Sequence, residues 1–137
     1  MFSIRISPLN REMLEYAVYG PPPGQALISI MDHKRDCRER YPAQRVLRLC
    51  FDDAVEASFR QDLIRAEQAE AIRDFVLRYQ NEIDVLIIHC TAGVSRSAAV
   101  AAAVLAGCGA DDGVIWNDPR YQPNPLVYRV VRAAFEE

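Results

Sequence analysis

The feature that most constrains the fold is a short apolar run that ends in a polar loop and continues into an alanine-rich segment. The run, Val85 to Ile88, is too short for a helix and is typical of a central parallel strand covered on both faces. Gly93 lies in the loop, and a helix is predicted over roughly Ser97 to Leu105, stopping at Gly107. The chain therefore needs a fold in which a buried strand passes through a tight loop directly into a helix.

The other apolar patterns alternate between strand and helix. The sequence predicts strands at Phe2 to Ile6, Ala26 to Met31 and Val46 to Phe51, and helices from Ser7-Pro8 to about Val18, around Ala69 to Tyr79, and from Asn124-Pro125 onward with Leu126, Val130 and Phe135 facing inward. This order indicates an α/β fold with a central, mostly parallel sheet of about four to five strands flanked by helices. Ligands of such sheets bind at the carboxyl ends of the strands.

Length and composition narrow the class of protein further. A chain of 137 residues with a net charge of −3 is expected to form one domain over residues 1–137, with no general affinity for nucleic acid or an anionic membrane. Its four cysteines are Cys37, Cys50, Cys90 and Cys108. They lack the spacing of a zinc site, and a chain of this length does not need disulfide bonds to stabilise its fold. Without a secretory signal pattern or a membrane-length apolar run, we expect a soluble, cytoplasmic protein.

The residues after the predicted central strand are suited to binding a tetrahedral anion. Successive backbone N–H groups of such a loop converge on one point, and the following helix N-terminus adds partial positive charge there. Arg96 can donate two parallel hydrogen bonds to two oxygens of a phosphate. The predicted phosphate-binding residues are Thr91, Ala92, Gly93, Val94, Ser95 and Arg96.

Cys90 stands at the start of this loop, where the amides, the helix terminus and Arg96 favour a thiolate over a thiol. A thiolate under a bound phosphate is a nucleophile aimed at phosphorus, and its attack gives a covalent phosphocysteine that water then hydrolyses. This chemistry requires no metal and no cofactor. We expect Ser97 to donate a hydrogen bond to the departing sulfur, and His89 to order the loop backbone.

The string His89-Cys90-x5-Arg96-Ser97 resembles the signature of the cysteine-based protein tyrosine phosphatases, most closely the compact dual-specificity branch and its bacterial relatives. The resemblance implies a single phosphatase domain that hydrolyses phosphorylated proteins or peptides, most often at phosphotyrosine. It also implies an aspartate on an upstream loop that protonates the leaving oxygen.

Two adjacent aspartates are candidates for this acid. Asp52 and Asp53 follow the predicted strand at Val46 to Phe51 and precede Cys90 by 38 and 37 residues. The spacing in the family favours Asp53, with Asp52 as the alternative. The acid would give a proton to the tyrosyl oxygen and would then take one from the attacking water. Without the signature, a turn or helix-cap role would be the better interpretation of both residues.

Other functions are compatible with parts of the pattern. A non-catalytic phosphotyrosine-binding module would keep the loop and lose the acid, a sulfurtransferase would use a loop cysteine without the arginine signature, and a phosphoinositide phosphatase usually carries lysine in the loop. A disulfide between Cys50 and an oxidised Cys90 is a possible redox control. The remaining candidates are interpreted as structural or solvent-exposed: His33, the basic group Lys34, Arg35, Arg38 and Arg40, and Asp118.

Overall fold

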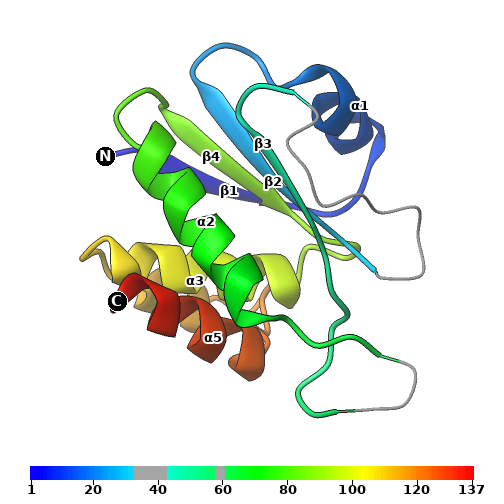
Figure 1. Cartoon of the computed structure of the whole chain (residues 1–137), viewed down its shortest axis with the longest axis vertical. Helices are drawn as coiled ribbons and strands as arrows, with labels where there is room; N and C mark the ends of the chain where they lie inside the picture. The colour runs from blue at the N-terminus through cyan, green and yellow to red at the C-terminus, as the bar shows by residue number, and fades with distance from the viewer. Residues whose placement is uncertain (33–42, 58–60) are drawn as a thin grey trace.

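The fold is built on a parallel sheet. The computed structural model describes residues 1–32, 43–57 and 61–137, and in these ranges four strands pair in the order β1-β4-β2-β3 (Figure 1). Every neighbouring pair is parallel. The strands are β1 (Ser3–Ser7), β2 (Gln25–Met31), β3 (Val46–Cys50) and β4 (Val85–His89). The α/β class and the strand number predicted from the sequence are confirmed.

Helices cover both faces of the sheet (Figure 1). They are α1 (Arg11–Tyr19), α2 (Ala66–Tyr79), α3 (Arg96–Gly107), α4 (Gly113–Trp116) and α5 (Pro125–Phe135). Met13 and Ala17 of α1 pack on one face against Leu27 and Ile87, whereas α2, α3 and α5 pack on the other. Because β4 is covered on both sides, its sequence is continuously apolar and does not alternate with polar residues.

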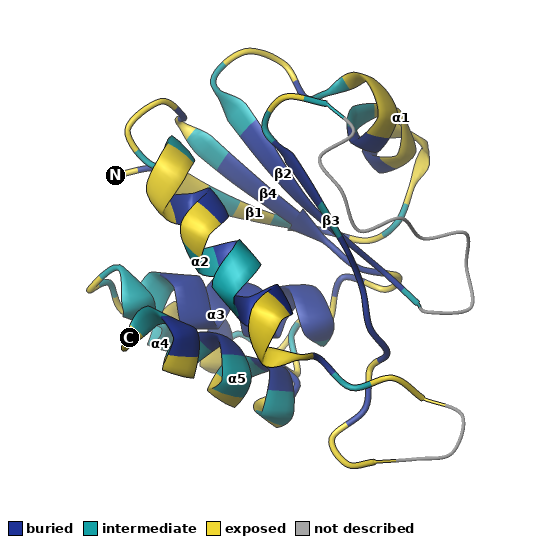
Figure 2. Cartoon of the chain, in the orientation of Figure 1, coloured by how far each residue is buried: buried dark blue, intermediate teal, exposed yellow. Residues whose placement is uncertain are grey.

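The helix that follows β4 is the most deeply buried helix of the described chain. All residues from Ala98 to Val104 are inaccessible to solvent, as the dark blue of α3 in Figure 2 shows. A helix that is apolar on every side needs neighbours all round, and α3 lies between the sheet and α5. Its small side chains allow this close packing, so the start of α3 is held rigidly beside the end of β4.

Two helices differ in detail from the sequence prediction. The first begins at Arg11, and its cap is Asn10, whose Oδ1 accepts a hydrogen bond from the Met13 N–H at 2.9 Å. The predicted cap, Ser7, is instead the last residue of β1, where it pairs in register with His89. Ser7-Pro8 has the local preferences of a helix start, but sheet pairing takes precedence.

The last helix has the predicted Asn124 cap and Pro125 start, but a different buried face. Val127, Val131 and Ala134 are buried in it. The residues expected to face inward, Leu126, Val130 and Phe135, are only partly buried at the rim of the core. Both stripes are apolar in the sequence, so packing against α2 and α3 decides which one is covered. The short helix α4 was not predicted.

The cysteines have different covalent states. Cys50 at the end of β3 is disulfide-bonded, whereas Cys90 and Cys108 are free. The pairing of Cys50 with Cys90 considered from the sequence is therefore not the one found. His33, Cys37 and the basic group Lys34 to Arg40 lie outside the described residues. No helix in the described ranges has the length and apolar character needed to cross a membrane.

Candidate active site

The loop between β4 and α3 is packed tightly against the connection that follows β1. Gly93 has a φ of +72°, which L side chains rarely adopt, and an added Cβ would lie 2.7 Å from the Pro8 nitrogen and 2.9 Å from the Ser7 carbonyl carbon. The Leu9 N–H donates to the Thr91 carbonyl at 3.0 Å. Only glycine fits here, so the loop conformation depends on both its own sequence and the neighbouring backbone.

This loop forms the floor of a cavity of about 520 Å³ at the carboxyl ends of the strands, where the sequence placed the ligand site. Cys90 lies at its base with 2% of its surface exposed. Its Sγ is 3.1 Å from the hydroxyl oxygen of Ser97. The lining residues are Asp32, Asp53, Cys90, Thr91, Ala92, Val94, Ser95, Arg96 and Gln122. Gly93 is buried on the side of the loop that faces Ser7 and Pro8, whereas the other predicted phosphate-binding residues line the cavity.

Arg96 is held in place from three sides. Its Nη1 donates to the Asp32 carboxylate at 2.7 Å and to the Phe51 carbonyl at 2.8 Å, and its Nη2 donates to the Thr91 hydroxyl at 3.1 Å. The side chain is nearly buried, and its ion pair with Asp32 joins the end of β2 to the start of α3. A guanidinium fixed in this way is ready to receive an anion without losing side-chain freedom.

His89 is a neutral, buried residue beneath the loop. Its Nε2 lies 2.6 Å from the Ser29 hydroxyl, and its Nδ1 lies 3.4 Å from the Cys90 carbonyl. Burial lowers the pKa of His89 to about 4, and the charge of Arg96 acts in the same direction. The side chain is 1% exposed and does not line the cavity. These contacts suit a residue that orders the loop rather than one that transfers protons to a ligand.

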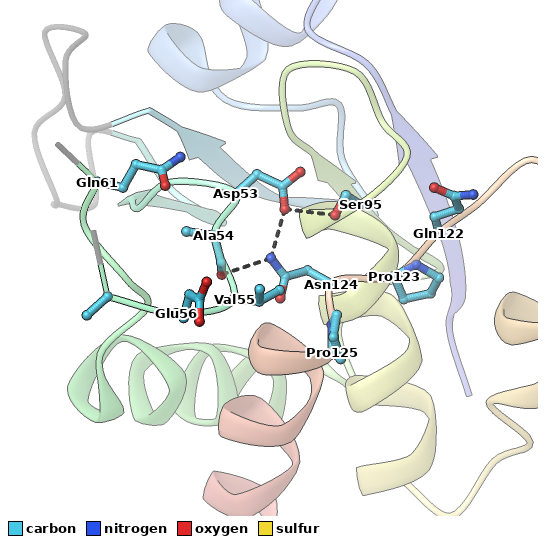
Figure 3. A pocket seen from close by; sticks show the side chains of 11 residues that line it. Asp53, Ala54, Val55, Glu56, Gln61, Ser95, Gln122, Pro123, Asn124 and Pro125 are labelled. Atoms are coloured by element: carbon cyan, nitrogen blue, oxygen red, sulfur yellow. Dashed lines mark hydrogen bonds between the residues drawn. The ribbon is translucent and has the colours of Figure 1, made fainter. Parts of the chain in front are cut away.

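The two adjacent aspartates point to different places. Asp53 is exposed, lines the cavity with Cys90, and accepts hydrogen bonds at one carboxylate oxygen from Ser95 and from Asn124, both at 2.8 Å (Figure 3). Asp52 is 8% exposed and does not line the cavity; it accepts a hydrogen bond from the Asp62 N–H at 2.7 Å. Asp52 thus binds the backbone of its own loop, whereas Asp53 faces the cavity that contains Cys90.

Three residues at the site were not identified from the sequence as functional. Asn124 was predicted only as a helix cap, but its amide nitrogen also donates to Asp53 and to the Ala54 carbonyl at 3.1 Å. Asp32 and Gln122 line the cavity. The position of Asp32 directly after β2 was an available signal, because side chains at the carboxyl ends of parallel strands converge. Nothing in the local sequence marks Gln122.

Two other candidates lie away from this cavity. Cys108 follows α3 at the end opposite the loop, and burial raises the pKa of its thiol. Asp118 pairs with Arg120 at 2.7 Å on the surface, and this hydrogen bonding lowers the pKa of Asp118. Neither residue lines the cavity that contains Cys90.

Comparison with known proteins gives structural matches only. No protein-family model and no curated protein sequence matches the chain. Human DUSP28 superposes with a TM-score of 0.62 at 16% identity, over 99% of this chain and 93% of that one. The PTP-2 phosphatase of Cydia pomonella superposes with a TM-score of 0.61 at 17% identity, over 96% of this chain and 84% of that one. PTPMT1 in complex with PI(5)P superposes with a TM-score of 0.60 at 16% identity, over 98% of this chain and 90% of that one.

Together, the parallel sheet, its helices and the loop after β4 define a cysteine-based phosphatase fold. More narrowly, the chain shares the compact fold of these three solved structures over nearly its whole length.

Proposed function

We propose that the protein is a metal-independent phosphomonoester hydrolase of one domain, residues 1–137, that acts on phosphotyrosine in proteins or peptides, with or without activity on phosphoserine and phosphothreonine. The observation that carries the proposal is that Cys90, Arg96 and Asp53 line one cavity at the carboxyl edge of the sheet. A nucleophile, an anion clamp and an acid in one cavity are the parts that phosphate ester hydrolysis requires.

In the first step, the Cys90 thiolate attacks phosphorus and forms a sulfur–phosphorus bond while the bond to the leaving oxygen breaks. Arg96 and the loop amides bind the phosphoryl oxygens. Asp53 gives its proton to the leaving oxygen. One of its carboxylate oxygens already accepts from Ser95 and Asn124, so the other oxygen is the one available for this transfer.

In the second step, water attacks the phosphocysteine and Asp53 takes a proton from it, so inorganic phosphate is released and the thiolate is restored. Ser97 supports the departing sulfur by a hydrogen bond across the 3.1 Å contact. The cycle consumes only water. Because the nucleophile must stay reduced, we expect the protein to act in a reducing compartment such as the cytoplasm, where the disulfide of Cys50 would be reduced as well.

A phosphoinositide is the second candidate substrate, since a structural neighbour, PTPMT1, is found in complex with PI(5)P. The loop side chains between Cys90 and Arg96 carry no charge in this chain. They offer no cation to the additional phosphates of such a lipid, which favours the protein substrate.

The test is hydrolysis of an aryl phosphate in the presence of a chelator. The wild type should release phosphate, and Cys90→Ser should release none while still binding the ester. A folded wild type that binds phosphotyrosine without turnover would instead support a non-catalytic binding module. Activity that survives Cys90→Ser would overturn the mechanism.

A further inference from the structure

Figure 3 shows a second cavity, of about 740 Å³, beside the one that contains Cys90 in the described structure; the latter is not drawn there. The two cavities share Asp53, Ser95 and Gln122. When the phosphate of a substrate lies over the loop, the part of the substrate that extends out of the first cavity therefore contacts the second. The position suits the residues that flank a phosphorylated side chain.

Among the described residues that line the second cavity, the charged ones are both acidic. Glu56 lines it together with Asp53, and neither carboxylate forms an ion pair with a described residue. No Lys or Arg is among its lining residues in the described ranges. Glu56 is the carboxylate of this cavity that has no part in the proposed mechanism. An anionic group entering here meets repulsion, and a cationic group meets an unpaired partner.

The walls suit a long cationic side chain. Exposed Val55 and Pro125 provide apolar surface, and the amide of Gln61 provides a further polar group. Lys and Arg side chains place their methylene stems along apolar surface and their charged ends on a carboxylate.

Building on the proposed function, we propose that this cavity is a substrate subsite: it binds a Lys or Arg side chain that flanks the phosphotyrosine, with Glu56 as its charged partner. The same charge disfavours a second phosphate, so phosphopeptides with a basic flank are preferred over acidic phosphopeptides and over polyphosphorylated inositol lipids.

The test compares the hydrolysis of a series of phosphotyrosine peptides. In each peptide, Arg, Ala or Glu occupies one of the three positions on either side of the phosphotyrosine. For the wild type, kcat/KM at one or more positions should follow the order Arg, Ala, Glu. An exposed ion pair corresponds to roughly two- to fivefold between Arg and Ala. Glu56→Gln should abolish this difference, and Glu56→Arg should reverse it, with each rate expressed relative to the same variant's hydrolysis of an aryl phosphate.

Glu82→Gln is the matched control, since Glu82 is an exposed carboxylate that lines neither cavity, and it should keep the wild-type order. The same peptides are also bound to Cys90→Ser, which measures flank preference without turnover. An unchanged order in Glu56→Gln, or faster hydrolysis of phosphatidylinositol bisphosphate vesicles than of the best Arg peptide, would overturn the subsite. Failure of the proposed function itself would be seen separately, as absent aryl phosphate hydrolysis.

Discussion

At the scale of single residues, the site depends on environment more than on residue type. Asp52 and Asp53 are chemically identical neighbours, yet one binds the backbone of its own loop and the other lines the cavity above Cys90. Asp53 is held by Ser95 and Asn124, two donors from elements far away in the sequence. The two residues should therefore respond differently to the same substitution.

Asp53→Asn should lower kcat by about 10²–10⁴ for a substrate with a poor leaving group such as phenyl phosphate, because the oxygen then departs without a proton. The loss should be smaller for a nitrophenyl ester, whose leaving group needs less protonation. Asp52→Asn should keep the leaving-group dependence of the wild type and lower the free energy of unfolding instead. If Asp52→Asn alone steepens this dependence, the assignment of the acid is wrong.

The buried His89 makes stability depend on pH. Its pKa is about 4 in the folded state and ordinarily about 6.5, so the unfolded chain binds more protons between these values. The free energy of unfolding should therefore fall as the pH is lowered from about 6.5, by up to about 3 kcal/mol near pH 4. Urea unfolding at several pH values measures this loss.

His89→Gln provides the comparison, since an amide can still form hydrogen bonds but does not titrate in this range. The variant should be less stable at neutral pH and should lose less stability on acidification than the wild type. Equal losses in the two proteins would show that other groups cause the pH dependence.

At the scale of elements, the loop after β4 is shaped by its neighbour as well as by its own sequence. Gly93 lies against Ser7 and Pro8, which connect β1 to α1. The loop amides thus depend on an element at the other end of the chain for their direction. A change in this contact should alter anion binding even though Gly93 does not line the cavity.

Gly93→Ala should lower both the free energy of unfolding and the affinity for inorganic phosphate, because the new Cβ would collide with backbone atoms that cannot rotate away. Gly109→Ala is a matched control: its φ is +79°, but an added Cβ meets nothing within 4 Å. The control should lose only about 1 kcal/mol of backbone strain and keep phosphate affinity. Calorimetric unfolding and phosphate titration would distinguish the two, and equal effects would contradict the role of packing.

Helix α5 is connected to the site through its cap. The Asn124 Oδ1 accepts from the Leu126 and Val127 N–H groups while its Nδ2 donates to Asp53. Asn124→Ala should lose both functions, including about 0.5–2 kcal/mol of capping.

Asn124→Ser separates these functions, since its hydroxyl can cap the helix but does not replace the amide donors. It should keep most of the stability while lowering kcat more than it raises KM. A variant with full stability and full kcat would show that Asp53 needs no support from Asn124.

At the scale of the whole molecule, features encoded by neighbouring residues could be predicted from the sequence. Features that depend on contacts between distant residues could not. The strand–loop–helix unit from Val85 to Gly107 is local, and the sequence predicted both its order and the location of a cavity at its loop. The ion pair between Arg96 and Asp32 joins residues that are 64 positions apart, and the bond between Asn124 and Asp53 spans 71. No local pattern encodes such contacts, so the supporting groups were missed.

The errors in predicting the first helix start and the buried face of α5 also arise from contacts between distant parts of the chain. Ser7-Pro8 satisfies the local rules for a helix start as well as Asn10 does, and only pairing with β4 extends β1 through Ser7. Likewise, two apolar stripes of α5 compete until α2 and α3 cover one of them. Tertiary packing decides between local alternatives that are nearly equal in propensity.

The proposed mechanism requires that Cys90 carries the phosphoryl group between the two steps. Rapid acid quenching of the wild type during aryl phosphate hydrolysis in chelator, followed by mass spectrometry of the peptide that contains Cys90, tests it directly. We predict one phosphoryl group on Cys90 that appears and decays with turnover, and none in Cys90→Ser. Steady hydrolysis by the wild type with Cys90 unmodified at every quench time would contradict the account.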